Sequence, residues 1–390
     1  MRKYIYLLFI SFITFNTFAY RELPNIDTLS KSSYISLITC DPGNELYSVF
    51  GHNAIGIVDA EQNLFLVFNY GTFSFNVPFF YLKFASGKLL YNLSFTSYNN
   101  FLYEYRRDKR RVVEEKLNLT QYQKQRLFNL LKENYKPENR KYQYDFFFDN
   151  CATRIGQMFY KAFGDSLQYN PANNYEIKTF RNLIDEYLVN SYWSKFGIDI
   201  ALGSVIDEPA TEMEITFLPD YMSEFANCCT INGEPLISSS RLLVRESAPL
   251  TVTPVIIRPQ IIFTVVLVIV ILLTFLYNHK SWIIGDKIIF ITYGITGIVI
   301  LLLWFATDHD ATANNYNLLW ANPLYLIFAL FIGSEHKKIL KWSTIIILFI
   351  NIALLICWNI IPQQYNIVFI LFVLIAIIRS GVILLRVYKF

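Results

Sequence analysis

The sequence is poor in charge and in histidine. Charged residues make up 17% of the 390 positions, and the formal net charge is only +3. So small a charge argues against nucleic-acid binding, and the chain carries neither an RNA-binding signature nor a Gly-rich phosphate loop. No internal repeat is visible, which argues against a repeat array. Only His52 among the four histidines lies before residue 250, so imidazole chemistry in that part depends on one residue.

Apolar residues are in excess, at 54% of the chain, where soluble domains have about 45–50%. Part of the excess lies in residues 1–19, which are typical of a secretory signal: a basic start, an apolar core at residues 4–13 and a cleavage site ending at Ala19. An uncleaved anchor is the alternative. In both cases residues 20–250 are expected outside the cytoplasm. No Cys stands near position 20, so N-terminal lipidation of this chain is not expected.

The rest of the excess follows residue 250, in five apolar runs that we expect to cross a membrane. These spans lie near residues 260–277, 287–305, 318–333, 343–361 and 366–385. The third run is the shortest and contains Pro323, so it is either a tilted span or a partly re-entrant one.

Basic residues orient these spans. Alternate connecting segments carry them, at Lys280, Lys287, Lys337, Lys338, Lys341, Arg386 and Lys389. The other loops, residues 307–322 and 362–366, contain no Lys or Arg. Because cationic loops stay in the cytoplasm, the odd-numbered spans run inward and residues 20–258 lie outside. A four-span arrangement would put the loop at Lys337 on the wrong side and is disfavoured.

Residues 20–250 are expected to form one α+β domain. Alternating apolar patterns predict strands at residues 34–39, 51–58 and 64–70, a turn at 59–63 and a further strand pair at 81–95. Helices are predicted at residues 120–135, 151–163 and 179–189 and near 212–226, with an aromatic strand or approach segment at 144–148. Thr120 and Gln123 have the spacing of a capping box, and Asn150 and Gly164 are typical of the two ends of a helix.

Cys151 and His52 have the local sequence that thiol chemistry requires. Cys151 is expected in the first turn of a helix, whose unpaired N–H groups and positive dipole end lower the pKa of a thiol. An imidazole can take the thiol proton and later return it. The alternative is a small buried core cysteine and a hydrogen-bonded core histidine.

The order of these residues resembles the permuted papain-like fold (NlpC/P60 and LRAT-like). There a strand with the His comes first, a polar residue on the next strand orients the imidazole, and the Cys helix follows. Asn69 is the first candidate for the orienting residue and Asp59 the second, although Asn69 also suits a turn at a strand end. We therefore expect an α+β papain-like extracytoplasmic domain followed by an all-α transmembrane bundle of about five helices.

A longer series of motifs resembles the Lnb-type lipoprotein N-acyltransferases. The motifs are FGHNA (50–54), FNYGTF (68–73), YDFFFDNCATR (144–154), FLPDY (217–221), WFATDH (304–309) and NLLWANP (317–323). The layout of signal, periplasmic domain and multi-span tail is also similar to that family. One departure is Gly56, because an Arg would be expected further along the strand that begins with His52.

The resemblance implies a bacterial inner-membrane enzyme with its catalytic domain in the periplasm. Such an enzyme moves an acyl chain from phospholipid, through a Cys151 thioester, to the N-terminal amine of diacylglyceryl lipoproteins. His52 and Asn69 would complete the catalytic set. Asn150, Arg154, Tyr70, Asp308 and His309 are the candidates for substrate binding or support. The alternatives are a papain-like cell-envelope cysteine hydrolase (peptidase, amidase or lipase) and a non-enzymatic sensor or assembly protein.

Other features carry weaker expectations. The aromatic stretch at residues 73–84 is either core or an acyl-facing surface, and the basic run at 106–111 is more typical of a solvated face than of a headgroup site. Cys40, Cys228 and Cys229 could include one disulfide. No cofactor is expected, and no metal either, because no convergent set of ligands accompanies Asp308 and His309.

Overall fold

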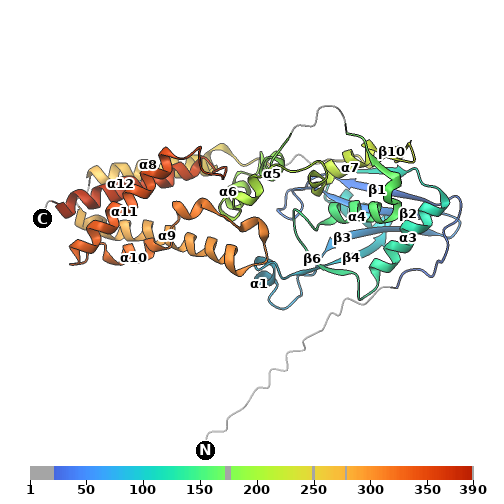
Figure 1. Ribbon diagram of the computed structural model, residues 1–390, viewed down its shortest axis with the longest axis horizontal. Helices are drawn as coiled ribbons and strands as arrows, with labels where there is room; N and C mark the ends of the chain where they lie inside the picture. Colours follow the sequence, from blue (N-terminus) through green and yellow to red (C-terminus); the bar gives the residue numbers. More distant parts are fainter. Residues whose placement is uncertain (1–21, 172–176, 248–250, 277–278, 389–390) are drawn as a thin grey trace, which may run out of the picture.

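The computed structural model describes residues 22–171, 177–247, 251–276 and 279–388, and it has two lobes joined end to end (Figure 1). One lobe is a mixed α/β domain and the other is a bundle of apolar helices. The predicted signal, residues 1–19, lies outside the described residues. The predicted α+β domain with a helical membrane bundle is confirmed.

A seven-stranded antiparallel sheet forms the centre of the α/β lobe, in the order β10-β5-β1-β2-β3-β4-β6. The strands are β1 Tyr34–Cys40, β2 His52–Asp59, β3 Leu64–Thr72, β4 Leu90–Ser97, β5 Val112–Leu117, β6 Lys141–Gln143 and β10 Ile237–Val244. The first three predicted strands are therefore confirmed. A smaller sheet contains β7 Leu167–Tyr169, β8 Cys229–Ile231 and β9 Glu234–Pro235.

The strand pair predicted at residues 81–95 is wrong in its first half. Helix α1 (Phe80–Ala85) occupies that part, and only β4 forms a strand. A strand pair there implied a buried apolar face, but Tyr81, Leu82 and Phe84 are all exposed. Phe79 precedes the helix with a left-handed φ of 57°. The predicted first strand of the pair is therefore a surface helix.

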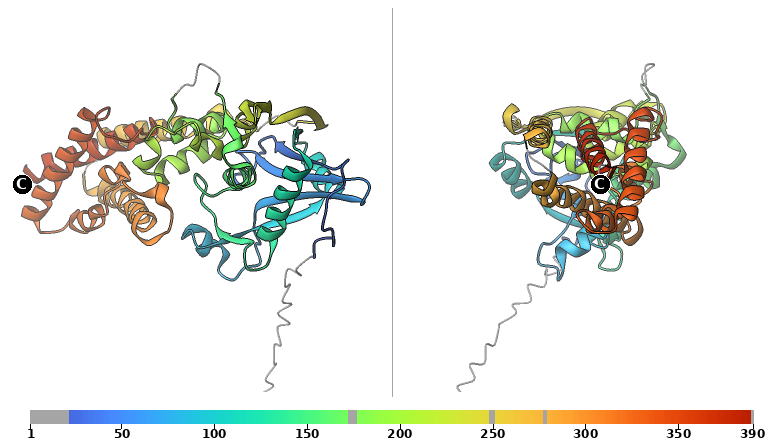
Figure 2. Two further views of the ribbon diagram at one scale, coloured as in Figure 1. Left: turned by 45° about the vertical axis from the view of Figure 1, so that its right-hand side comes forward. Right: turned by 90° about the vertical axis from the view of Figure 1, so that its left-hand side faces the viewer.

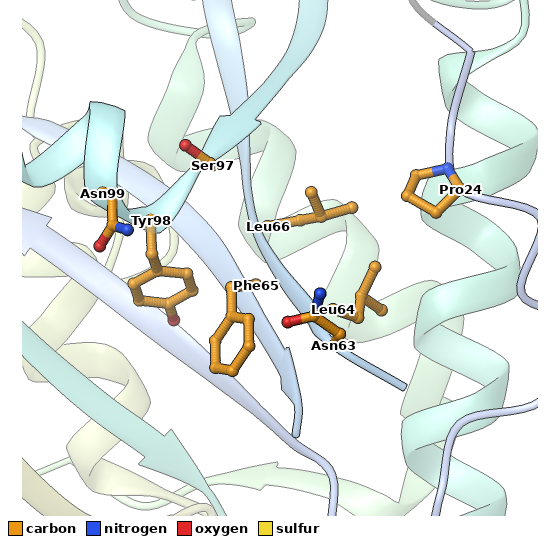
Figure 3. Close-up of a pocket in the computed structure, with 8 residues that line it drawn as sticks. All are labelled: Pro24, Asn63, Leu64, Phe65, Leu66, Ser97, Tyr98 and Asn99. Carbon is orange, nitrogen blue, oxygen red and sulfur yellow. The ribbon is translucent and has the colours of Figure 1, made fainter. Parts of the chain in front are cut away.

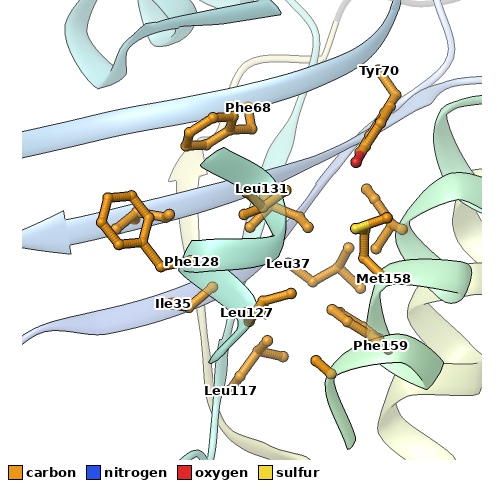
Figure 4. Packing of buried hydrophobic residues seen from close by; sticks show 14 of the residues in the cluster. Ile35, Leu37, Phe68, Tyr70, Leu117, Leu127, Phe128, Leu131, Met158 and Phe159 are labelled. Atoms are coloured by element: carbon orange, nitrogen blue, oxygen red, sulfur yellow. The ribbon is translucent and has the colours of Figure 1, made fainter. Parts of the chain in front are cut away.

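Helices α3 (Gln121–Tyr135) and α4 (Cys151–Phe163) cover one face of the sheet and close the main core (Figure 4). The Thr120–Gln123 capping box is present as predicted. Asn150 caps α4 and Gly164 ends it, also as predicted. Between α3 and α4, residues 144–148 form the approach segment and not a strand, because a bridge from Asp145 to Asp149 closes a turn there.

The opposite face of the sheet is covered by α2 (Tyr98–Arg107), which the sequence pattern did not reveal. Tyr98, Phe101 and Tyr105 form its buried side and pack on β1, β2 and β3. The basic run that follows is solvated in part, since Arg107 and Arg111 form exposed ion pairs.

Helices α5 (Phe180–Leu188) and α6 (Tyr192–Ala201) lie between the sheet and the second lobe (Figure 1 and Figure 2). Helix α7 (Pro219–Cys228) packs instead against α4 and the sheet, in the main core of the α/β lobe. The helix predicted near 212–226 starts later than expected, because a 3-10 turn η3 (Glu214–Phe217) precedes Pro219 at the helix start.

The second lobe contains α8 (Pro259–Leu276), α9 (His279–Ala306), α10 (Leu324–Phe331), α11 (Lys337–Ile356) and α12 (Val368–Tyr388). Four of these, all but α10, are long and apolar enough to cross a membrane. The third expected span thus becomes a 3-10 turn, η6 (Tyr316–Leu319), followed by the short α10.

The short third segment nevertheless runs along about half of α9. A Cβ on Gly297 of α9 would lie 2.0 Å from the Ala321 carbonyl oxygen, so only glycine permits this contact. Gly333, after α10, lies against Ile283 near the start of α9. Residues 321–333 therefore run antiparallel to α9 over 14 of its residues, a rise of about 21 Å. The end of α12 lies at the far end of the bundle from the sheet (Figure 1).

Buried polar bonds join the two lobes. Arg181 of α5 forms ion pairs with Asp199 and Asp207. From the loops of the membrane lobe, the Asn317 amide donates to the Asp199 carbonyl oxygen at 2.7 Å, and the Asn366 amide donates to the Asp199 carboxylate at 2.8 Å. The lobes are thus fastened together by hydrogen bonds as well as by the connecting chain.

Candidate active site

Cys151 begins α4, and its position is set by the cap before it. The buried Asn150 side chain accepts hydrogen bonds from Ala152 N at 2.8 Å and Thr153 N at 3.0 Å. Its amide nitrogen donates to the carbonyl oxygens of Phe146 and Phe217, both at 2.7 Å. One side chain therefore ties the start of the helix to two other segments and leaves Cys151 little freedom of backbone position.

Cys151 lies where β2 and β3 separate. The recorded pairing of these strands ends at Ile55 and Phe68, and continuing it by three residues would set His52 opposite Gly71. The start of α4 approaches this point instead: a Cβ on Gly71 would lie 3.8 Å from the Cys151 Cβ. The Asn53 backbone N–H donates to the Cys151 sulfur. The thiol therefore meets the strand one residue from His52.

His52 is oriented by Asn69, with His52 Nε2 3.3 Å from the Asn69 amide oxygen. The Asn69 amide nitrogen donates to the Val67 carbonyl oxygen at 3.4 Å, which directs the amide oxygen to the ring. We therefore assign the proton to His52 Nε2, leaving Nδ1 as the proton acceptor. Asp59, the second candidate, binds Ser30 and Gln62 at the other end of β2.

The thiol and the imidazole are adjacent but do not share a hydrogen bond in this structure, in which both residues are described. The sulfur instead accepts from backbone N–H groups, those of Asn53, Ala152 and Cys151 itself. Proton transfer would require the sulfur to come within hydrogen-bond distance of His52 Nδ1. Such loose geometry is common in active sites without substrate.

Burial keeps both groups neutral. It lowers the pKa of His52 to about 4, with Asn69 opposing this shift and Arg110 adding to it. Burial also raises the pKa of the Cys151 thiol, and this effect outweighs the backbone N–H groups that lower it. The expectation of a lowered thiol pKa is therefore wrong in net direction. The helix end acts as predicted, but desolvation is larger, so the resting site holds a thiol beside a neutral base.

Two of the predicted support residues lie close to the thiol without facing it. Arg154 forms an ion pair with Asp149 at 2.5 Å, and its guanidinium lies 3.7 Å from the centre of the Tyr142 ring. Tyr70 is fully buried on the core side of β3, and its hydroxyl donates to Asn134 at 2.6 Å. Arg154 thus braces the first turn of α4, and Tyr70 belongs to the core.

Asp308 and His309 lie at the junction of the lobes. Asp308 N donates to the Ser86 carbonyl oxygen at 3.0 Å, and the Asp308 carboxylate accepts from Gln143 at 3.1 Å. His309 Nε2 lies 3.1 Å from the Phe84 carbonyl oxygen. These residues hold the segment around α1, and their hydrogen-bond partners outside their own loop are in that segment and in β6.

Two family models match the chain in succession. Residues 24–186 match the Lnb N-terminal periplasmic domain, and residues 251–390 match the Lnb transmembrane domain. The chain belongs to the Lnb family. The resemblance read from the motifs is thereby confirmed, and the chain is a multi-pass membrane protein with a periplasmic domain. No curated protein and no solved structure matches this chain.

The structure explains one departure of this Lnb-family chain from the expected pattern. A Cβ on Gly56 would lie 1.8 Å from the Tyr98 hydroxyl oxygen. That hydroxyl is itself held by Glu114 at 2.7 Å on the α2 face of the sheet. No side chain therefore fits at position 56, and an Arg there is excluded by packing.

Sequence reasoning missed two residues beside the thiol. Tyr144 stacks on Tyr91, with ring centres 4.3 Å apart, and lies 3.8 Å from a Cβ placed on Gly71. Cys40 is the β1 partner of His52 and is buried, which raises its pKa to about 12. Tyr144 stands in the 144–154 motif, so that motif is the sequence feature that could have identified it.

All five cysteines of the chain's described part are free thiols, so no disulfide forms there.

A surface hollow of about 400 Å³ lies at the other end of β3 (Figure 3). Its lining residues are Pro24, Asn63, Leu64, Phe65, Leu66, Ser97, Tyr98 and Asn99. The thiol is at the opposite end of this strand, beside Gly71, so the hollow is separate from the candidate active site.

Proposed function

We propose that this Lnb-family chain is a thiol acyltransferase of the bacterial inner membrane. It would move a fatty acyl chain from phospholipid, through a Cys151 thioester, to the N-terminal amine of diacylglyceryl-cysteine lipoproteins. The observation that carries the proposal is the placement of the Cys151 thiol one residue from His52, whose ring is oriented by Asn69.

In the first step His52 Nδ1 takes the thiol proton as the Cys151 sulfur attacks an ester carbonyl of the phospholipid. The carbon–oxygen bond then breaks, and the leaving alkoxide receives the proton from His52. The products are a Cys151 thioester and a lysophospholipid. A neutral His52 with a pKa of about 4 is in the proton-accepting form at neutral pH.

In the second step the lipoprotein amine attacks the thioester. His52 takes a proton from the amine, the carbon–sulfur bond breaks, and the departing Cys151 sulfur is reprotonated by His52. The amide is thereby formed and the site is restored. Amines attack thioesters readily, and a dry site limits competing hydrolysis.

The N–H groups of Cys151 and Asn53 are the proposed donors to the oxyanion in both steps. Both already point to the sulfur. The Ala152 N–H, in contrast, also donates to the Asn150 cap. Placing the oxyanion between the helix start and β2 thus uses donors that the fold has already oriented.

A papain-like cell-envelope hydrolase with the same thiol is the second candidate. The membrane lobe argues for the transferase. An enzyme with two lipid substrates must be reached from the bilayer, whereas a peptidoglycan hydrolase does not need such access. The buried contacts of Asp199 with Asn317 and Asn366 support the same choice, since they hold the thiol domain to the membrane lobe.

The test is expression of the full chain in cells depleted of their own lipoprotein N-acyltransferase, followed by mass spectrometry of a model lipoprotein. We expect an added acyl chain, lost in Cys151→Ala and His52→Ala and retained in the matched control Cys228→Ala, a free cysteine elsewhere in the domain. Fatty-acid release with an unmodified lipoprotein amine would support the hydrolase, and an unmodified amine with folded protein present would overturn the transferase.

A further inference from the structure

Helix α1 and the residues before it expose large apolar side chains. Those with high exposure are Phe75, Phe79, Tyr81, Leu82 and Phe84. Phe79 is 77% exposed and Tyr81 is 81% exposed, and α1 has no buried residue. A group of aromatic side chains this exposed is typical of an interaction surface and not of a solvated one.

The position of α1 indicates what covers this surface. The hydrogen bonds of Asp308 and His309 to Ser86 and Phe84 fasten α1 to the chain just after the end of α9. Figure 1 shows α1 beside that end of the bundle. Phe305, in the last turn of α9, is also strongly exposed. The apolar surface of α1 therefore continues the lipid-facing surface of the bundle.

A row of aromatic rings connects α1 to the thiol. Phe84 stacks on Phe80 at 6.2 Å, and Phe80 stacks on Phe73 at 5.9 Å. Phe73 contacts Tyr91 at 5.1 Å between ring centres.

Tyr91 continues this row to the active site. It stacks on Tyr144 at 4.3 Å, and Tyr144 and the Cys151 Cβ each lie 3.8 Å from a Cβ placed on Gly71. Phe73, Phe80 and Tyr144 are only partly buried, whereas Tyr91 is buried, so the row is accessible on both sides of Tyr91.

We infer that α1 inserts among the acyl chains of the periplasmic leaflet and that the aromatic row from Phe84 to Tyr144 guides one phospholipid acyl chain to Cys151. The surface of α1 is aromatic and aliphatic, which suits an acyl chain and not a headgroup. Insertion of α1 follows from its position alone, whereas the role of that lipid as acyl donor rests on the proposed function.

Photocrosslinking tests insertion without any acyl transfer. The full-length Cys151→Ala variant is placed in phosphatidylethanolamine vesicles that contain a phospholipid with a diazirine on its acyl chain. Tyr122 of α3 is the internal control, because it is 72% exposed and α3 lies on the side of the α/β lobe away from the bundle, whereas α1 lies beside the bundle (Figure 1).

We expect adducts at residues 75–84 to exceed those at Tyr122 by about tenfold or more, as burial of several large apolar side chains in lipid implies, and weaker adducts at Tyr91 and Tyr144. Equal labelling of Tyr122 and α1 would overturn insertion. Labelling of Tyr91 and Tyr144 only by a diazirine lipopeptide, and not by the phospholipid, would assign the row to the acceptor and overturn the donor route.

Kinetics of Cys151 acylation test the donor route separately. In the triple variant Phe79→Ser, Tyr81→Ser, Leu82→Ser, acylation of Cys151 by phospholipid should be slower by about tenfold or more, and the loss should appear as a higher KM. Its rate with a water-soluble short-chain thioester should equal that of the unsubstituted protein. Tyr122→Ser is the matched control. Equal loss with both donors, or no loss with either, would overturn the route. If the unsubstituted protein reacts with neither donor, the proposed function fails, and the crosslinking result still decides insertion.

Discussion

His52 Nε2 and the Asn69 amide oxygen lie 3.3 Å apart across two neighbouring strands. This contact fixes the orientation of the His52 ring. With Nε2 donating to Asn69, Nδ1 is unprotonated, and under the proposed function it is the nitrogen that receives the proton of Cys151. The four predictions below start from this contact and extend to the cap of α4 and to the membrane bundle.

Replacing Asn69 by Ala should lower the rate of Cys151 acylation by about 10- to 100-fold, since a misoriented imidazole loses part of its contribution as base. Thermal stability should change little. Asn118→Ala is the matched control, because Asn118 is an exposed Asn with one hydrogen bond to a carbonyl oxygen. An Asn69→Ala variant with the unchanged rate would show that Asn69 does not orient the base.

The acylation rate should be insensitive to pH around neutrality and should fall only toward pH 4. Protonated His52 cannot accept the thiol proton, and burial lowers its pKa to about 4, so the neutral form persists well below 6.5. The measurement is the rate with a water-soluble thioester donor as a function of pH, with His52→Ala as the control that lacks the acid limb. A midpoint near pH 6.5 would contradict a desolvated His52.

Replacing Asn150 by Ala should destabilise the protein, because it removes the cap of α4 and leaves two buried carbonyl oxygens without their donor. We expect a loss of about 2–4 kcal/mol, seen as a fall in Tm of about 5–10 °C. Asn150→Asp keeps the cap but points an acceptor at both carbonyl oxygens, so it should rescue little. Full rescue by Asp would mean that the cap alone carries the effect.

Asp286 and Arg379 form a bidentate ion pair inside the bundle, at 2.6 and 3.0 Å, with both side chains fully buried. Asp286→Asn alone should cost about 3–5 kcal/mol, because the Arg379 charge is left unpaired. Removing both charges with Asp286→Leu and Arg379→Met should recover much of this loss. Thermal unfolding of the full chain measures the effect, with Lys287→Gln as the neighbouring control. A double variant as unstable as the single one would argue against the pairing.

Local signals in the sequence predicted the elements that define the site. Thr120 with Gln123, and Asn150 before Cys151, act within three residues, so the starts of α3 and α4 could be read directly. The turn between β2 and β3 is similarly local and brings Asn69 back toward His52. These elements did not require knowledge of distant parts of the chain.

Features that depend on distant contacts were not predictable. Helix α1 is short and mostly apolar, and only its surroundings show that it faces no core. The row from Phe73 to Tyr144 requires β4 to lie beside β6, strands that are not consecutive. The pKa of Cys151 depends on how much protein covers the thiol, which the first turn of a helix does not reveal.

The junction at Asp199 bears on how acceptors would be selected. Asp199 is held from its own lobe by Arg181 and from the membrane lobe by Asn317 and Asn366. These bonds hold the lobe that carries Cys151 to the membrane lobe, so the position of the thiol relative to the bundle varies less than a loose tether would allow. Under the proposed function, an acceptor amine is then chosen by its depth relative to the membrane surface. Lipoproteins of unrelated sequence would react alike, whereas a peptide amine held further from the lipid would be out of reach.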